Sequence, residues 1–501
     1  MRSALFARNT LLPKQKPPKK PAKAIAAAHR EPIGARTVAH PKTACRVALI
    51  GFGTVGRAVT KILCETVLGE NGDGSLRLTH ICNRNVERKM QAWVPQVRVP
   101  NDVIWTSDFH EVLNSDADIV IELIGGLSPA GEIVRGALQA GKSVITANKQ
   151  LIARHGPELL QLASAKGMRL EFGASVAGGV PVLPALRTGL CGDRLHGIAG
   201  ILNGTCNYIL SRIESARIPF SEALEEAQAR GFAEADASED LDGGDARAKL
   251  AILVLAGLQA HVAPESIRAR SIRTVEAVDF DYASELGCTI RQISRADLKL
   301  DTQSGTVPPG SARAGQPRRL SPHDLGPETL FAEVGPSLVA VSSPFGRVQS
   351  NQNLVLTSGK YGGDMAFLGA GAGGDPTAVA VISDLKLVAQ SLAGANGRKG
   401  GGEVAAAALL SPETSCDFET PWYLRFLVRD RPGIVARLAQ ILSAHQLNID
   451  AVLQNPGFDK AALPFVITLE PCRDSQLRPA LEEMATLDFA IRPCLWLPIL
   501  P

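Results

Sequence analysis

The sequence predicts an α/β protein with a parallel sheet near its N-terminus and a smaller α+β unit at its C-terminus. An apolar run, Val47 to Ile50, leads into Gly51, Gly53 and Gly56 and then into a helical pattern. Strand candidates alternate with helical patterns as far as residue 170, as in parallel sheets with right-handed crossovers. The last 80 residues read strand, helix, strand, strand, helix, strand, which is a ferredoxin-like order.

Composition excludes several classes of protein. The 501 residues, 45% apolar and 21% charged, are typical of a soluble globular protein of about three domains. The net charge is +3, and residues 1–44 carry ten Lys or Arg and one acid, a net +9, so the rest carries +3 minus +9, or −6. This acidic body gives no reason to expect a nucleic-acid partner, and no run reaches the roughly 18 apolar residues of a membrane span.

Nine cysteines without a C-x-x-C pair favour a reducing compartment, and therefore a cytoplasmic protein, over a disulfide framework or zinc site. Residues 1–44 read as a disordered basic extension because they are rich in Pro, Lys, Arg and Ala. An organelle-targeting peptide is the alternative, although the run from Lys14 to Pro21 is too rich in proline for a good amphipathic transit helix.

The motif Gly51-x-Gly53-x-x-Gly56 predicts a dinucleotide site of the Rossmann type, since a strand precedes it and a helix follows it. In such a turn the first glycine permits the tight bend and the second lets the backbone approach a pyrophosphate. The third allows close packing of helix and strand. The helix N-terminus then presents free N–H groups to the phosphates.

Further strand candidates are Leu76 to Cys82, Asp118 to Ile124 and Ser143 to Thr146. Ligands bind beyond the carboxyl ends of such strands, which places Lys149 on one rim with the glycine turn as a contact for cofactor and substrate. The second strand ends at Arg84, without the acid expected of an NAD site, so we expect Arg84 to favour NADP by pairing with a 2′-phosphate. A plain surface charge is the alternative for both side chains.

Two loops rich in small residues follow. Phe172 to Pro181 offers backbone carbonyls to a ligand or a hard cation, or else forms a tight connection between domains. Gly200 to Leu210 offers Asn203, Gly204 and Thr205 to a polar small molecule, or else a capped helix start, and both can hold together.

An acidic segment lies beside a lysine. Glu234, Asp240 and Asp245 are among six acids within twelve residues, and Lys249 follows at the start of an apolar helix. Asp245 and Lys249 are spaced i, i+4 and share a helix face. We expect Lys249 to be partly buried, with a lowered pKa suited to proton transfer, and the acids to hold an amine. A solvated acidic loop is the alternative. With a nicotinamide nearby, this pattern suggests an amino alcohol or amino aldehyde as substrate.

A second glycine turn, Gly369 to Thr377, precedes a helix predicted over Ala378 to Ala389. It includes Gly371 and is fit to face phosphate or nicotinamide, or else acts as a hinge. Residues 301–328 form a predicted loop, and residues 396–420 a predicted linker rich in Gly and Ala.

These residues together resemble the homoserine dehydrogenase family, in its single-function form with a C-terminal ACT domain. The motifs occur in the order of the family: Gly51–Gly56, Glu122–Gly126, Thr146–Lys149, Gly200–Thr205, Gly231–Asp236 running to Lys249, and Gly369–Ala378. The resemblance implies an NAD(P)-dependent enzyme that interconverts L-homoserine and L-aspartate 4-semialdehyde, in threonine and methionine biosynthesis.

The implied domains are a Rossmann domain at 45–170, completed by about 370–395, a catalytic and dimerisation domain at 171–369, and an ACT domain at 421–501. A homodimer or homotetramer is implied because the family pairs two chains through the sheet of its middle region. A threonine effector is implied near the turn Asp430–Gly433. An oligomerisation module without ligand is the alternative for the ACT domain.

The resemblance also implies residue roles. Lys249 matches the proton-transfer lysine, Lys149 the lysine between cofactor and substrate, and Asp245 the acid beside Lys249. Substrate contacts match Glu234, Asp240, Gly204 and Thr205. In the phosphate-binding turn, the residues that match the cofactor contacts of the family are Gly51, Thr54 and Val55. The patterns described above add further predicted cofactor contacts: Gly53, Gly56, Arg84, Lys149 and Gly371.

One position departs from the family pattern. The resemblance implies a sodium site with backbone carbonyls from Val176, Gly178 and Val180 and one glutamate, but the position of that glutamate is Gly173 here. Sodium binding is therefore in doubt. Two other functions stay open: an NAD(P) oxidoreductase acting on a related amino aldehyde, and an amino-acid sensor that has lost catalysis.

Overall fold

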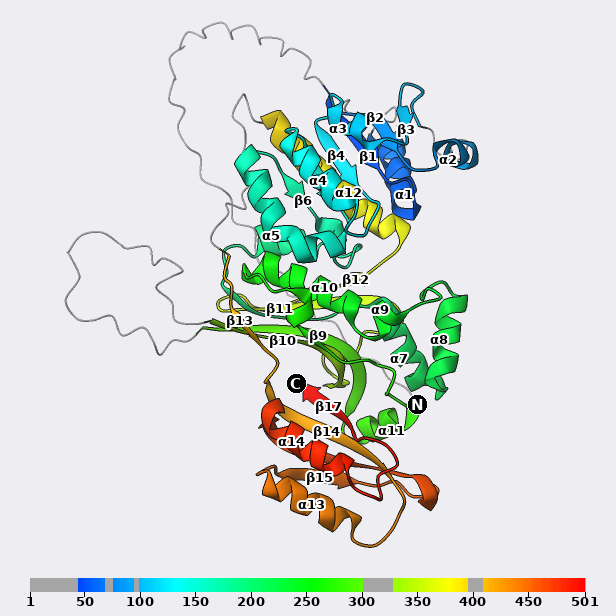
Figure 1. Cartoon of the computed structure of the whole chain (residues 1–501), viewed down its shortest axis with the longest axis vertical. Coiled ribbons are helices and arrows are strands. Elements are labelled where there is room, and N and C mark those ends of the chain that lie inside the picture. The colour runs from blue at the N-terminus through cyan, green and yellow to red at the C-terminus, as the bar shows by residue number, and fades with distance from the viewer. Residues whose placement is uncertain (1–43, 68–74, 94–98, 301–327, 395–408, 501) are drawn as a thin grey trace, which may run out of the picture. The chain divides into compact units, whose positions relative to one another are not determined.

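The computed structural model describes residues 44–67, 75–93, 99–300, 328–394 and 409–500 (Figure 1). The predicted extension apart from residue 44, the predicted loop apart from residue 328, and residues 396–408 of the predicted linker therefore lie outside the described residues. None of the described helices is both long and apolar enough to cross a membrane.

The N-terminal sheet is parallel, with strand order β3-β2-β1-β4-β5-β6, which is the Rossmann order. Its strands are β1 (Cys45–Ile50), β2 (Leu76–Cys82), β3 (Ile104–Thr106), β4 (Ile119–Glu122), β5 (Ser143–Thr146) and β6 (Leu170–Glu171). The strand order reverses between β1 and β4, so the crevice for a dinucleotide opens at their carboxyl ends. This confirms the fold class predicted for this part of the chain.

Helices cover both faces of this sheet (Figure 1). α1 (Thr54–Ile62) and α12 (Gly374–Gly394) bury one face, against alternate strand residues such as Leu49 and Ile121. α4 (Ala130–Gln139) and α5 (Lys149–Lys166) bury the other face, against Ala48 and Val120. The shorter helices are α2 (Val86–Trp93) and α3 (Phe109–Asn114). α12 begins at Gly374, four residues before the predicted start, because Pro376 is tolerated in a first helical turn.

The middle region forms the antiparallel part of a second sheet, with strand order β12-β11-β7-β9-β10. Its strands are β7 (Leu195–Ile201), β9 (Cys288–Leu300), β10 (Glu328–Ala340), β11 (Gln352–Gly359) and β12 (Gly363–Ala370). Its helices are α6 (Val182–Pro184), α7 (Gly204–Ala216), α8 (Phe220–Ala229), α9 (Ser238–Leu241), α10 (Gly244–Leu253) and α11 (Ala277–Glu285). α10 begins five residues before Lys249, so Asp245 and Lys249 both lie inside it.

The C-terminal unit has the predicted ferredoxin-like order of elements. It contains β14 (Glu419–Val428), α13 (Ile434–Ala444), β15 (Ile449–Leu453), β16 (Leu463–Arg473), α14 (Asp474–Ala485) and β17 (Leu495–Leu500). α13 and α14 bury one face of the four strands (Figure 1). The sequence also predicts that the last strand is an edge strand near Ile491–Leu495, and this prediction is wrong. Residues 491–493 are exposed, while β17 pairs with β14 on one side and β10 on the other.

Two short strands also pair with β10: β8 (Arg268–Ala269) and β13 (Glu413–Ser415). β13 falls within the segment predicted to be linker. Its pairing could not be predicted because three residues carry no periodic pattern.

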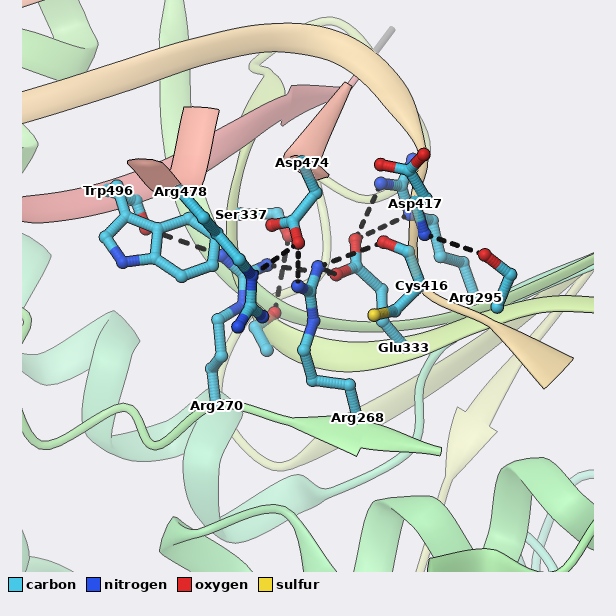
Figure 2. A network of polar contacts seen from close by, with 12 residues as sticks. Arg268, Arg270, Arg295, Glu333, Ser337, Cys416, Asp417, Asp474, Arg478 and Trp496 are labelled. Carbon is cyan, nitrogen blue, oxygen red and sulfur yellow. Dashed lines mark hydrogen bonds and ion pairs between the residues drawn. The ribbon is translucent and has the colours of Figure 1, made fainter. Parts of the chain in front are cut away.

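A buried network of charged side chains joins the middle region to the C-terminal unit (Figure 2). We call it the junction network and define it by Arg268, Arg270, Arg295, Glu333 and Asp474. Glu333 accepts hydrogen bonds from Arg295 at 2.6 and 2.9 Å and from Arg268 at 2.8 Å. Asp474, at the start of α14, accepts a hydrogen bond from Arg268 at 2.6 Å. This network links β8, β9 and β10 to the C-terminal unit.

Candidate active site

The glycine turn after β1 has the geometry that a dinucleotide requires. Gly51 has φ +105°, and a Cβ there would lie 2.7 Å from the backbone of Leu123. A Cβ on Gly56 would lie 2.0 Å from the Gly51 carbonyl oxygen, so helix α1 can pack here only with glycine. Gly53 is the N-cap of α1, and Thr54 and Val55 form its first turn. The free N–H groups of that turn therefore face the crevice at the sheet edge.

The rest of the rim is built by hydrogen bonds between strand ends. Asn148 caps α5 and also donates to the Gly126 carbonyl at 2.6 Å. Asn83, at the end of β2, accepts from the Phe52 N–H at 3.3 Å. Its neighbour Arg84 is exposed. Lys149 is the first residue of α5 and thus lies on the rim, as the sequence predicted.

Lys149 and Lys249 share one carboxylate, that of Asp245. Lys249 Nζ lies 2.7 Å from Asp245 Oδ2, and Lys149 Nζ is hydrogen-bonded to Oδ1. The Asp245 side chain is 3% exposed, whereas the side chains of Lys249 and Lys149 are 12% and 39% exposed. The predicted i, i+4 pair and the predicted partial burial of Lys249 are therefore confirmed. The structure adds that residues from two domains converge on Asp245.

One asparagine, Asn203, and a second acid, Asp240, complete this group. Asn203 Nδ2 donates to Asp240 Oδ1 at 2.7 Å and to Asp245 Oδ2 at 2.9 Å, and its Oδ1 caps α7 by accepting from the Cys206 N–H. The predicted helix cap is therefore confirmed, and the contact of this loop with a small molecule stays a prediction. We call Lys149, Asn203, Asp240, Asp245 and Lys249 the catalytic cluster. The sequence marked Asn203 only as one polar group of a loop, since nothing in it shows that both acids reach this amide.

Burial and neighbouring charges shift the pKa values of this cluster in opposite directions. Burial alone would raise the pKa of Asp245, but the two lysines outweigh it and hold that pKa well below its usual range. Burial lowers the pKa of Lys149, yet the Asp245 carboxylate more than offsets this, and the net shift is upward. The pKa of Asp240 is raised, chiefly by burial and also by the negative charge of Asp245. Asp245 therefore remains ionised at neutral pH.

Other predicted substrate contacts lie around the cluster. Thr205 Oγ1 donates to the Phe232 carbonyl at 2.6 Å, and a Cβ on Gly204 would lie 2.7 Å from the Asn351 carbonyl oxygen. Glu234 is exposed, and Gln228 binds only its backbone carbonyl, so the structure does not bring its carboxylate into the cluster. Glu239 is another of the six acids that the sequence predicted to hold an amine. Its carboxylate lies at the N-terminus of α10, where a Cβ on Gly244 would come within 2.2 Å of Oε2.

The second glycine turn packs against the loop after β6. Gly178 and Gly179 donate from their N–H groups to the carbonyls of Gly371 and Ala370, both at 3.0 Å. A Cβ on Gly178 would lie 2.6 Å from Thr377 Oγ1, and one on Gly374 would lie 3.1 Å from Thr54 Cγ2. Residues 370–374 therefore lie beside the first glycine turn and close the rim. This tight packing explains the small residues of both loops.

The predicted sodium site lacks the carboxylate that the resemblance implies. The carbonyl of Val180 accepts from the Val182 N–H at 2.8 Å. Gly173 supplies no carboxylate, and a Cβ there would lie 2.7 Å from Asp384 Oδ1. Asp384, on α12, instead accepts from the Gly173 N–H at 2.8 Å. The residues present do not fit the family site, so no chemistry is assigned to a cation.

The C-terminal unit has a pocket of about 220 Å³ at the start of α13. It is lined by Asp430, Arg431, Gly433, Ile434, Gln454 and Phe465, among others. Gly433 is the N-cap of α13, with φ +96°, so free N–H groups of the helix lie beside this pocket. The pocket adjoins the turn that the sequence singled out.

Comparisons with known proteins agree with this geometry. Residues 51–173 match the NAD binding domain of homoserine dehydrogenase, residues 181–385 match homoserine dehydrogenase, and residues 422–489 match the ACT domain. Homoserine dehydrogenase of Synechocystis sp. is 33% identical over 455 residues, covering 88% of this chain and 96% of that protein. That of Bacillus subtilis is 32% identical over 430 residues, covering 85% and 91%. The crystal structure of a homoserine dehydrogenase from Thiobacillus denitrificans superposes with a TM-score of 0.75 at 30% identity, covering 91% of this chain and 98% of that one. The chain thus belongs to the homoserine dehydrogenase family of NAD(P)-dependent oxidoreductases.

Proposed function

We propose that the catalytic cluster carries out the interconversion of L-homoserine and L-aspartate 4-semialdehyde. The proposal rests on one observation: Lys149 and Lys249 both pair with Asp245, beside the rim of the dinucleotide crevice. Two cations on one buried carboxylate leave a polar, positively charged face toward the crevice. Such a face suits an oxygen whose proton is transferred during reaction.

When bound, the nicotinamide exchanges a hydride with the C4 carbon of the substrate. For oxidation Lys249 Nζ must be the neutral amine, which takes the hydroxyl proton; in reduction the Lys249 ammonium returns that proton. Lys149 lies at the cofactor side and stabilises the substrate oxygen as its charge changes. Asp245 stays ionised and orients both ammonium groups. Asp240 holds the substrate ammonium, with Gly204 and Thr205 bordering the substrate, whereas the Glu234 carboxylate lies outside the cluster.

The test is absorbance at 340 nm with purified protein, L-homoserine, and NAD or NADP in parallel. We expect reduction of a cofactor by the wild type and loss of turnover in Lys249→Ala. Near-normal turnover in Lys249→Ala would remove that residue from the mechanism. Failure of the wild type in both directions, including oxidation of NADPH with aspartate semialdehyde, would contradict the activity itself.

The cofactor contacts proposed are Gly51, Gly53, Thr54, Val55 and Gly56 in the first turn, Gly371 in the second, and Lys149 and Arg84. We propose NADP as the preferred cofactor because Arg84 is exposed at the end of β2, where the sequence has no acid. Replacing Arg84 with alanine should lower kcat/KM for NADP and leave that for NAD within twofold. Equal losses with both cofactors would contradict this preference.

An amino-acid effector, threonine, is proposed for the pocket beside Gly433. Free N–H groups of α13 suit a carboxylate, and Asp430 and Gln454 offer acceptors to an ammonium group. Threonine should lower turnover in the same 340 nm assay. A response that survives substitution of pocket residues such as Gln454 would place the effector elsewhere.

We also propose a cytoplasmic homodimer or homotetramer, acting in threonine and methionine biosynthesis. The support for self-association is β12, an edge strand on which Met365 and Leu368 are 43% and 58% exposed, together with Tyr361 in the turn before it, which is 78% exposed. A second copy of the chain would cover this apolar edge. Sedimentation of the wild type and of a Leu368→Lys variant tests this.

A further inference from the structure

Asn353 lies beside the catalytic cluster and shares a partner with Lys249. It is the second residue of β11, is 1% exposed, and donates from Nδ2 to the Leu202 carbonyl at 2.8 Å. Lys249 Nζ donates to the same carbonyl oxygen, also at 2.8 Å. Leu202 follows the last residue of β7, which is paired with β11. One backbone carbonyl therefore receives both side chains.

The Asn353 amide can lie only one way round. A carbonyl oxygen accepts and cannot donate, so the amide NH2 must face Leu202 and Oδ1 must face away. Oδ1 is buried and has no hydrogen-bond partner among the described residues. On that side it lies against Gly371, where an added Cβ would come within 2.0 Å of Oδ1, and near Gly204, where it would come within 3.5 Å. An unpaired buried acceptor is costly, so this position is not explained by stability.

The contacts of Lys249 Nζ leave it one direction open. An ammonium group has three N–H bonds. Asp245 Oδ2 takes one at 2.7 Å and the Leu202 carbonyl takes a second at 2.8 Å. The third position of Nζ, and so the line along which a proton moves, is fixed by these two partners. Any tilt of the Leu202 carbonyl would therefore change that line.

We propose that Asn353 is a positioning residue for catalysis, which fixes the Leu202 carbonyl and through it the direction of Lys249 Nζ. This inference rests on the proposed role of Lys249. Among the described residues, no hydrogen bond joins the Asn353 side chain to the cluster acids or to the dinucleotide turn. Asn353 also packs against Gly371, in the loop that closes the cofactor crevice, so closely that a side chain at position 371 would displace it. Asn353 thus connects Lys249, through the Leu202 carbonyl, to this loop.

Asn207 offers a matched control. It is also buried, at 0% exposed, donates from Nδ2 to a backbone carbonyl, that of Ser350, at 2.9 Å, and leaves its Oδ1 unpaired among the described residues. It makes no contact with Leu202 or Lys249 in the hydrogen bonds of the described chain. Substituting either asparagine with alanine removes the same groups from the interior and should cost similar stability.

The experiment compares Asn353→Ala and Asn207→Ala in the full-length protein. We expect Asn353→Ala to lower kcat about tenfold to a hundredfold, since small misplacements of reacting groups have such effects. KM for homoserine should stay within about threefold, and the primary isotope effect with 4-deuterated homoserine should rise as chemistry becomes limiting. Asn207→Ala should lower the melting temperature to a similar extent and leave kcat and the isotope effect near wild type.

A second set of variants tests whether Asn353 acts through Lys249. Asn353→Ala should lower kcat far less in a Lys249→Ala background than in the wild type. Equal losses in both backgrounds, or a kcat no lower than that of Asn207→Ala, would overturn the inference. Normal turnover of Lys249→Ala alone would instead overturn the proposed function. If Asn353→Ala does not fold, Asn353→Asp, which keeps the shape and cannot donate to Leu202, should show the same loss of kcat.

Discussion

The catalytic cluster and the junction network are two buried groups of charges built to opposite designs. In the catalytic cluster two lysines meet one aspartate, and the Lys149 side chain is still 39% exposed. In the junction network three arginines meet Glu333, and all four side chains are at most 14% exposed (Figure 2). Lysine can lose its proton in a protein and arginine cannot. The choice of cation therefore separates the site proposed to move protons from the network that joins the middle region to the C-terminal unit.

The two groups also differ in the hydrogen bonds that their central acids, Asp245 and Glu333, accept. Glu333 receives forked hydrogen bonds from Arg295, and the Arg295 guanidinium lies 3.6 Å from the centre of the Phe418 ring. The three arginines outweigh burial and lower the pKa of Glu333 to about 2. Planar, forked donors suit fixed pairing, whereas the point charge of a lysine leaves an N–H bond free for a substrate.

The largest effect should come from exchanging the cation type in the catalytic cluster. Lys249→Arg keeps a positive charge beside Asp245 but cannot transfer a proton near neutral pH. We expect kcat to fall about 10²- to 10⁴-fold, the usual contribution of acid–base catalysis, while the melting temperature stays within a few degrees. Steady-state kinetics and thermal unfolding measure the two effects. A Lys249→Arg enzyme with substantial turnover would show that only charge is needed there.

The junction network should show the reverse pattern in Glu333→Gln. Removing one partner of a buried ion pair leaves uncompensated charge, and about 3–5 kcal/mol of unfolding free energy should be lost. Activity per folded molecule should stay near wild type, because Glu333 touches no member of the catalytic cluster in the described hydrogen bonds. Denaturant unfolding measures this loss. Glu158→Gln is the control, since Glu158 pairs with Arg135 at the surface, is 57% exposed, and should cost less than about 1 kcal/mol.

Asp240 tests whether the catalytic cluster binds substrate through charge. Asp240→Asn keeps the size of the side chain and removes the negative charge proposed to hold the ammonium group. We expect KM for homoserine to rise about tenfold or more, because a hydrogen bond to a charged group contributes about 1.5–3 kcal/mol. Asp242→Asn is a neighbouring control, because Asp242 is half exposed and pairs with Arg273. Similar KM changes in both variants would mean that the acidic segment acts only as a diffuse field.

The sequence predicted much of the catalytic cluster but not the junction network, and the reason is physical. The i, i+4 pair of Asp245 and Lys249 is local, so periodicity reveals it, and the Rossmann order follows from alternating strands and helices. The junction network joins residues 268, 295, 333 and 474, which are brought together only by sheet pairing. Asn203 and Asn353 were undervalued because an amide between two acids, or beside a backbone carbonyl, has no spacing rule.

The smallest effect concerns Asp384, a buried carboxylate that, unlike Asp245 and Glu333, forms no ion pair among the described residues. Burial, with a smaller contribution from Glu171, raises its pKa to about 7, whereas cations lower the pKa of Asp245 and Glu333. The folded state thus binds a proton more tightly than the unfolded state, whose carboxyl pKa is about 3.9. Stability should therefore fall as pH rises from about 4 through 7. In Asp384→Asn, whose Oδ1 can still accept from the Gly173 N–H, this dependence should be weaker. We expect the melting temperature of the wild type to drop by a few degrees more than that of the variant between pH 5.5 and 8.5. If the melting temperatures of the wild type and the variant change in parallel with pH, Asp384 does not titrate in this range. The hydrogen bond from the Gly173 N–H, and not burial, would then determine the charge of Asp384.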